Sequence, residues 1–408
     1  MKKSVRGFLC ALMAAAVCIA ASGCDNPFDQ REQLDAPECI LLDDFVYWEQ
    51  VAGADGYVVS VNGEEMPVQT ERGYRLDKSA DAEVKVKAVA AEDSKEFQDS
   101  DFTVSLFRRA DPAELTEMTD TDIYNLAQNG DPSVTLETKD TYNKRYTVRL
   151  AESSRGYFLD VSAATQLNEF KFIVPPAVGL IRIYTYASSQ KVSFEIEQRT
   201  DAIIFEFRGA NIVGVDDHDA IYTQSDIELP GVAEVAIRSL YMDMTGLEDE
   251  KVQIENSVTG GNNTVHGKAA EGYSSTGFGL TGGDGGKGYC GVRAPRVVFC
   301  GEEGFSAYGG RGSNGGRGGE AKKNFLGWYR NEGGHGGDGG NGGDGISANA
   351  VYVNISSGKP LAAGGGTGGY KGEKGSGFND LGNNNASDGR RGTAVTGEQI
   401  VISGSVQA

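Results

Sequence analysis

The stretch Gly282–Gly286 reads GGDGG, and the same five letters return at Gly336–Gly340, 54 residues further along the chain. At that offset the match continues without a gap through Gly315 and Gly369. Self-similarity at a fixed period is the sequence signature of a repeat architecture. The other matching positions are Gly291 with Gly345, Val292 with Ile346, Ala294 with Ala348, Val297 with Val351, Phe299 with Val353, and Gly304 with Gly358.

The repeat unit is a glycine-rich arm, then a strand with alternating apolar residues, then a second glycine-rich arm. A looser third copy spans Gly392–Gly404, where Ile400 and Ile402 take the places of Val351 and Val353. One strand alone cannot bury its apolar face, so we expect each unit to stack on the next. Residues 259–408 are therefore predicted to continue a parallel β-helix.

The glycine-rich arms hold most of the 58 glycines and have too few side chains for a hydrophobic core. Two outcomes are open: the arms are disordered, or they form extended helices with three residues per turn that lie side by side. In the second case bare backbone faces let neighbouring N–H and C=O groups bond to one another. We favour this polyglycine-II-like packing.

Residues 151–258, upstream of the arms, read as short β-runs at close spacing, with dense aromatic and β-branched content at Phe194–Ile196 and Ile204–Phe207. Single strands separated by polar turns favour a right-handed parallel β-helix. An antiparallel sandwich is the alternative, although it would need more hairpin-type dipeptides between the runs. The expected fold class is all-β.

Residues 36–107 also alternate between strand-like runs and turns, such as Asn62-Gly63. The string Val46–Gly63 (VYWEQVAGADGYVVSVNG) resembles fibronectin type III domains, and the resemblance implies a β-sandwich with Trp48 and Tyr57 in its core. The tyrosine usual before the sixth strand is absent. Residues 108–150 read as a transition with a short capped helix near Asp120–Ala127.

The first 23 residues combine a positive start at Lys2, Lys3 and Arg6 with an apolar run that is short for a membrane span. The sequence Ala21-Ser22-Gly23-Cys24 resembles the bacterial lipobox. The resemblance implies cleavage between Gly23 and Cys24, lipidation of Cys24, and anchoring to a membrane outside the cytoplasm, at the cell surface or the periplasmic face. Residues 24–35 would be the tether.

Of the six cysteines, Cys10 and Cys18 would be removed with the predicted lipoprotein signal peptide (residues 1–23), and Cys24 would carry the lipid. An oxidising compartment allows one disulfide, Cys290–Cys300, with Cys39 left over. The alternative is three buried thiols, since nothing in the sequence determines the geometry.

The formal net charge of −20 argues against a nucleic-acid partner, because polyanions would be repelled. No P-loop, nucleophile elbow or zinc motif is present, so we expect no cofactor.

Asp201 and the pair Asp216-Asp217 resemble two motifs of β-helical polygalacturonases, which invert by using paired carboxylates. The resemblance would make these three residues the catalytic set. However, Thr264-Val265-His266-Gly267 lacks the first glycine of that family's Gly-His-Gly motif. We expect an acidic, solvated turn instead.

Two further sites come from the glycine-rich third of the chain. Gly339–Ser347 fits the calcium-binding nonapeptide with Asp344 as its aspartate, although Lys287 takes the aspartate position in the upstream copy. Trp328 and Tyr329 lie in 321–330, a segment that interrupts the glycine-rich sequence and also contains Lys322, Lys323 and Arg330. Exposed aromatic side chains among cations would suit a carbohydrate or partner protein, whereas a small buried plug is the alternative.

The predicted function is therefore an envelope lipoprotein with a structural, adhesion or ligand-presenting role and no catalysis. The alternative is a polysaccharide-active β-helix enzyme.

Overall fold

A computed structural model describes most of the chain beyond residue 30. Residues 1–30, with Gly23 and Cys24, lie outside the described residues, and so does Asp201. The described ranges are 31–37, 39–42, 45–48, 50–76, 82–107, 114–162, 168–185, 189–199, 202–223, 234–240, 256–301, 303–355, 361–378, 384–397, 399–402 and 406–407.

The chain forms two compact units. The smaller unit contains the described residues before 40, together with 48–72 and 85–104, and the larger unit contains the rest. The smaller unit contains a parallel pair of strands, β1 (Glu32–Gln33) and β8 (Phe97–Gln98). The N-terminal strands also form a sheet in the order β5 (Glu64–Glu65), β4 (Gly56–Val61), β7 (Ala82–Val89) and β9 (Thr103–Phe107), and a sheet in the order β2 (Cys39–Leu42), β3 (Phe45–Trp48) and β6 (Gly73–Arg75).

Trp48 and Tyr57 lie edge to face in the smaller unit, with ring centroids 5.5 Å apart. Both rings are buried, and the Tyr57 hydroxyl accepts a hydrogen bond from the backbone N–H of Val51 at 3.0 Å. Such aromatic contacts add to the burial of the rings themselves. The prediction that both side chains belong to a core is confirmed.

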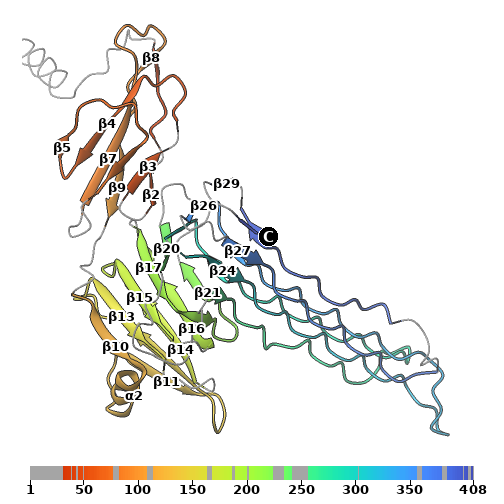
Figure 1. Cartoon of the computed structure of the whole chain (residues 1–408). Coiled ribbons are helices and arrows are strands. Elements are labelled where there is room, and N and C mark those ends of the chain that lie inside the picture. The colour runs from red at the N-terminus through yellow and green to blue at the C-terminus, as the bar shows by residue number, and fades with distance from the viewer. Residues whose placement is uncertain are drawn as a thin grey trace, which may run out of the picture. The chain divides into compact units, whose positions relative to one another are not determined.

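The larger unit is built on two sheets in which the strands are almost all parallel (Figure 1). Within the described residues the first sheet has eight strands. In order they are β10 (Thr116–Thr119), β13 (Gly156–Asp160), β15 (Leu180–Tyr184), β17 (Ile203–Arg208), β20 (Glu234–Leu240), β23 (Arg296–Gly301), β26 (Ala350–Ile355) and β29 (Gln399–Ile402).

The second sheet begins as a single row and then divides into two. The row runs from β11 (Val134–Thr138), antiparallel to β12 (Lys144–Arg149), through β14 (Asn168–Val174) to β16 (Ser189–Ile196). One branch is β18 (Asn211–Val213), β21 (Asn256–Thr259), β24 (Phe305–Tyr308), β27 (Leu361–Gly364) and β30 (Val406–Gln407). The other is β19 (Ile221–Thr223), β22 (Val292–Arg293), β25 (Ile346–Ser347) and β28 (Val395–Thr396).

The chain alternates between the sheets and adds strands to each as it proceeds. Equivalent residues are therefore paired in register from rung to rung, as Phe299 is with Val353 and Val353 with Ile402. Val297, Val351 and Ile400 are paired in register in the same way. The 54-residue repeat and its third copy are thus confirmed as successive parallel rungs, and the antiparallel sandwich for 151–258 is wrong.

The helix α2 (Asp120–Gln128) precedes the stack, close to its predicted position. Thr119 is the N-cap residue: its hydroxyl accepts from the N–H of Asp122, whose carboxylate accepts from the N–H of Thr119. This reciprocal capping box satisfies two of the first-turn donors. Ile123 is buried against the core of the stack, so the helix covers apolar side chains at that end.

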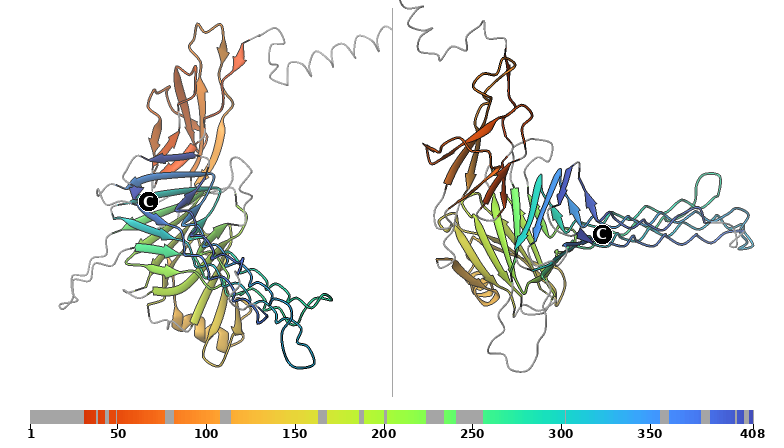
Figure 2. Two further views of the ribbon diagram at one scale, coloured as in Figure 1. Left: turned by 90° about the vertical axis from the view of Figure 1, so that its right-hand side faces the viewer. Right: turned by 45° about the horizontal axis from the view of Figure 1, so that its top comes forward.

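Three long glycine-rich connections join the two branches of the second sheet. Glycine hairpin 1 is residues 260–291, between β21 and β22; hairpin 2 is 309–345, between β24 and β25; and hairpin 3 is 365–394, between β27 and β28. The turn 214–220 joins β18 to β19 at the same place one rung earlier. The described segments of the hairpins run side by side away from the sheets in both views of Figure 2.

Candidate functional site

Backbone hydrogen bonds at a period of three residues hold the glycine hairpins together. The return segment of hairpin 1 donates to the return segment of hairpin 2 over distances of 2.8–3.1 Å. A period of three is that of an extended helix with three residues per turn. In this ladder Gly282, Gly285, Gly288 and Gly291 donate to the carbonyls of His335, Asp338, Asn341 and Asp344.

Other rows of bonds cross the bundle from side to side. In one row, each backbone N–H donates to the carbonyl of the next segment at 2.8–3.1 Å: Gly392 to Gly366, Gly366 to Gly343, Gly343 to Gly310, Gly310 to Tyr289 and Tyr289 to Gly261. The described hairpins therefore satisfy their backbone groups without a sheet. Disorder of the glycine-rich arms is wrong for these residues, and packed extended helices are confirmed.

Glycine is needed in the bundle for space rather than for backbone freedom. A Cβ atom on Gly337 would lie 1.9 Å from the carbonyl oxygen of Gly283, and one on Gly340 would lie 2.0 Å from that of Gly286. No side chain fits at such distances. Positive φ among the described glycines of the hairpins is confined to Gly272, Gly277 and Gly327, which lie at the far ends.

The third residue of each Gly-Gly-x step supplies the side chains of the bundle. Asp338, Asn341 and Asp344 each accept a backbone N–H of hairpin 3 on a side-chain oxygen, at 2.6–2.9 Å. His335 accepts the N–H of Asn385 on Nδ1 at 3.2 Å. Acceptors at this position therefore extend the backbone ladder from hairpin 2 to hairpin 3.

Asp344 is engaged in this ladder and in an ion pair. Its Oδ2 lies 2.9 Å from Nζ of Lys287, and its Oδ1 accepts the N–H of Thr393 at 2.8 Å. The hydrogen bond to Asp344 raises the pKa of Lys287, so this ammonium stays charged beside the carboxylate. In the described part of the chain no group of three metal-binding side chains comes together, at Asp344 or elsewhere.

The aspartates of the turn 214–220 fasten hairpin 1 to the stack. Asp217, with a φ of 66°, accepts the backbone N–H of Thr264 at 2.8 Å and also the Thr264 hydroxyl. Asp219 accepts the N–H of Cys290 at 2.6 Å. These two carboxylates bind the outgoing and returning ends of hairpin 1, where its backbone leaves the sheet.

Asp216 belongs to a different cluster, on the surface of the second sheet. Its Oδ2 lies 2.7 Å from Nζ of Lys191, which also approaches Glu169 at 3.3 Å. Glu169 is buried and pairs with Lys139 and Arg145, both at 2.9 Å. The cluster is thus balanced by cations, whereas a pair of inverting catalytic carboxylates needs space between them for a water molecule.

Cys290 and Cys300 are buried thiols in the structure, not a disulfide. Burial, together with the nearby carboxylate of Asp219, raises the pKa of Cys290 to about 12. The Cys300 thiol lies 3.7 Å from the carbonyl oxygen of Ile237, in the first sheet. Because its pKa is so high, Cys290 has little of the reactive thiolate form near neutral pH.

Large exposed apolar side chains gather at the far ends of the hairpins. Among the described residues thirteen such side chains are exposed, and seven of them lie there. Phe325 is 92% exposed, Phe378 75%, Trp328 71% and Leu326 65%. The other three of the seven are Tyr273, Phe278 and Leu280. Because Trp328 is on the surface, the alternative of a small buried plug is wrong.

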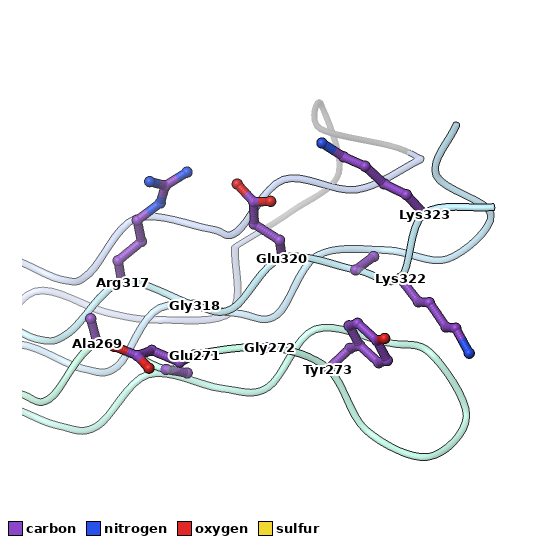
Figure 3. A pocket seen from close by; sticks show the side chains of 11 residues that line it. Ala269, Glu271, Gly272, Tyr273, Arg317, Gly318, Glu320, Lys322 and Lys323 are labelled. Carbon is purple, nitrogen blue, oxygen red and sulfur yellow. The ribbon is translucent and has the colours of Figure 1, made fainter. Parts of the chain in front are cut away.

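Cations lie over the aromatic rings at these ends. Nζ of Lys323 is 4.8 Å from the ring centroid of Tyr329, and Nζ of Lys322 is 5.6 Å from that of Tyr273. An open hollow of about 600 Å³ lies beside them, and Figure 3 shows its lining. The charged and aromatic residues of that lining are Glu271, Tyr273, Arg317, Glu320, Lys322 and Lys323.

The sequence indicated the position of this surface but not its extent. Trp328 and Tyr329 marked the break in the glycine-rich sequence, yet Phe325 is more exposed than Trp328, and Leu326 is nearly as exposed. Tyr273 and Phe278 come from hairpin 1, 50 residues away from Lys323 and Trp328. A comparison of the two hairpin ends at that offset would have found them.

Comparison of the chain with protein-family models, with curated proteins and with solved structures finds no match. Among the described residues no helix is both long and apolar enough to cross a membrane. The proposal below therefore depends on the sequence of the chain and on the geometry of the bundle.

Proposed function

We propose that this protein is a non-catalytic lipoprotein of the bacterial cell envelope, and that the far end of its glycine bundle is a contact surface. Cys24 would carry the lipid, and the fibronectin type III-like region would act as a spacer. The parallel stack, which we take to be a right-handed β-helix, would support the bundle.

The observation that carries the proposal is the concentration of exposed aromatic and aliphatic side chains at the hairpin ends. Exposed apolar surface of this kind is costly in water and marks interaction sites. Trp and Tyr are also the residue types that dominate binding energy at interfaces. The bundle beneath these side chains is held by backbone bonds across every segment, so it presents them from a fixed frame.

The positions of the acidic residues support a non-catalytic role. Asp217 and Asp219 hold the base of hairpin 1, and Asp216 is paired with Lys191. Each of these carboxylates thus has a structural partner that accounts for its position. The polysaccharide-active alternative would rest on Asp201 together with these residues, and no contact of Asp216 or Asp217 favours it.

A pair of matched variants tests the contact surface. Trp328→Ala with Tyr329→Ala removes two rings from the end of hairpin 2, whereas Tyr142→Ala removes an exposed ring between β11 and β12. Binding of the purified full chain to bacterial and host cells, glycan arrays and matrix proteins is then measured. We expect the first variant to lose binding by at least about tenfold and the control to retain it. Equal binding by both would contradict the proposal.

A further inference from the structure

The ends of hairpins 1 and 2 each form a turn with the same pattern of backbone contacts, which we call the turn frame, and the two turns lie 50 residues apart in the sequence. An antiparallel bridge closes each turn, between Tyr273 and Gly279 in the first and between Lys323 and Tyr329 in the second. We call these two segments turn 1 (273–279) and turn 2 (323–329). In each turn the second residue donates its backbone N–H to the sixth, at 2.7 Å in turn 1 and 2.8 Å in turn 2.

The fifth residue of each turn is a glycine with positive φ. Gly277 has a φ of 88° and Gly327 a φ of 81°, values that disfavour residues with a side chain. Each donates its N–H to the carbonyl of the second residue, at 2.8 Å to Ser274 and 2.9 Å to Asn324. The two turns therefore have the same bridge, the same two backbone hydrogen bonds and the same positive φ at the fifth residue.

The side chains at the third and fourth positions differ completely in chemistry. Turn 1 carries Ser275 and Thr276 there, whereas turn 2 carries Phe325 and Leu326. Because turn 1 forms the same frame with polar residues, the turn does not need apolar ones in order to fold. Phe325, exposed over 92% of its surface, buries almost nothing within the chain. Among the described residues it has little to pack against, so its ring is available to a partner outside the protein.

The polar groups of turn 2 bond within the turn. Oδ1 of Asn324 accepts the N–H of Leu326 at 2.9 Å and that of Trp328 at 3.0 Å. Sugars are recognised by stacking combined with directed hydrogen bonds, and ligand pockets are concave. The hollow beside Lys322 and Lys323 is not lined by Phe325, Leu326 or Trp328. These residues instead form a projecting apolar end whose nearest backbone donors are already used. A lipid surface requires neither directed donors nor a pocket.

The charges around turn 2 fit an anionic surface. Lys322, Lys323 and Arg330 flank the apolar residues and are exposed. The three glycine hairpins together carry eleven Lys and Arg against nine Asp and Glu, whereas the whole chain carries 38 against 58. The bundle thus has a formal net charge of +2, eleven minus nine, and lacks the net negative charge of the whole chain, which would repel anionic lipids. Trp and Tyr beside Lys and Arg are also the side chains that favour the boundary between headgroups and acyl chains.

We propose that turn 2 inserts into the interfacial region of an anionic lipid bilayer, with Phe325 and Leu326 among the upper acyl chains and Lys322 and Lys323 at the phosphates. The inference rests on the proposed function, in that the same hairpin ends make the contact. It adds that the partner of turn 2 is a lipid surface and not a sugar or a protein pocket.

The chain contains a built-in reporter for this contact. Its two tryptophans are Trp48, which is fully buried in the smaller unit, and Trp328 in turn 2. The full chain is mixed with vesicles of phosphatidylcholine and phosphatidylglycerol whose acyl chains are brominated, and tryptophan emission is recorded. We expect Trp328 to shift to shorter wavelength and to be quenched by the bromines, with Trp48 unaffected.

The matched variant is Phe325→Ser with Leu326→Thr, which gives turn 2 the residues of turn 1 and so preserves its frame. We expect its Trp328 emission to require at least about tenfold more lipid for the same quenching. Replacing Lys322, Lys323 and Arg330 by Gln should remove the preference for phosphatidylglycerol. The apolar N-terminus can bring every variant to the vesicles, so Trp328 quenching is the readout and co-sedimentation is not.

Two results would overturn the lipid proposal. One is unquenched Trp328 emission from chains that co-sediment with the vesicles. The other is a Trp328 shift caused by a glycan or protein without lipid and abolished in the Phe325→Ser, Leu326→Thr variant. In that second case the hairpin ends remain a contact surface and only the identity of the partner changes. If Trp328→Ala with Tyr329→Ala leaves cell and matrix binding intact as well, the proposed function fails too.

Discussion

The stacked sheets and the glycine bundle are continuous with each other, yet they are stabilised in opposite ways. In the stack, side chains such as Phe205 and Phe299 fill the interior, and the backbone bonds only to the strands above and below. In the bundle the backbone itself fills the interior, and side chains would be obstacles there. A chain can therefore form an ordered core without apolar side chains, provided that its backbone groups bond in every direction.

The largest effect is expected from removing a ring in the stack. Phe205 is fully buried and lies edge to face with Phe194, at 5.1 Å between centroids. Phe205→Ala should lower the free energy of unfolding by about 3–5 kcal/mol, because the cavity cannot be filled by a rigid sheet. Chemical denaturation followed by circular dichroism would measure the loss. A change within about 0.5 kcal/mol, as for surface substitutions, would contradict the packed-core description.

The opposite substitution should damage the bundle. Gly337→Ala adds a Cβ 1.9 Å from the carbonyl oxygen of Gly283 and should cost about 1–3 kcal/mol by overpacking. Hydrogen exchange should show lost amide protection in hairpins 1 to 3, with the two sheets unaffected. Gly283→Ala is the milder comparison within the same bundle, because a Cβ there would come no closer than 3.1 Å to another atom and the backbone is not in the left-handed region. Unchanged protection in Gly337→Ala would mean that the hairpins do not pack as described.

A smaller effect is expected where the two regions join. Asp217→Ala removes both acceptors for Thr264, and we expect a loss of about 1–2 kcal/mol. Asp217→Asn keeps one carbonyl oxygen and tolerates the positive φ, so its loss should be well under half as large. Amide exchange at Thr264 would report both variants, and identical behaviour of the two would argue against a capping role.

The smallest effect is expected at acid pH, from Glu169. Burial alone would raise the pKa of this carboxyl, but Lys139, Arg145 and Lys191 outweigh it and lower the pKa below the usual 4.5. A lowered pKa in the folded state adds stability that is present above the unfolded value and is lost as the pH falls through the folded value. Stability should therefore decline below about pH 4.5.

Glu169→Gln tests the source of this acid sensitivity. The variant should be less stable near neutral pH and should show a shallower decline on acidification, as followed by thermal melting between pH 7 and pH 3. A melting profile parallel to that of the unchanged chain would place the sensitivity at other carboxyls.

Several features of the fold followed from the sequence alone. The 54-residue repeat predicted which residues stack, and Val353 indeed pairs with both Phe299 and Ile402. Short β-runs placed most of the described strands of 151–258 within a few residues, because β-branched and aromatic residues are enriched in strands. The prediction of a turn at 209–214 was wrong, because this segment contains β18. The helix near Asp120 was evident from its capping residues.

The tertiary structure alone decided what the polar residues do. Asp216, Asp217 and Asp219 are neighbours in the chain, yet one joins a charged cluster and two hold hairpin 1, because their partners come from segments that only folding brings close. Hydrogen-bond partners depend on distance in space, whereas rungs repeat in sequence. The repeat in the sequence predicted packed glycine-rich arms. Only the structure showed Phe325 and Leu326 exposed at the end of hairpin 2, on a turn whose conformation hairpin 1 forms with Ser275 and Thr276.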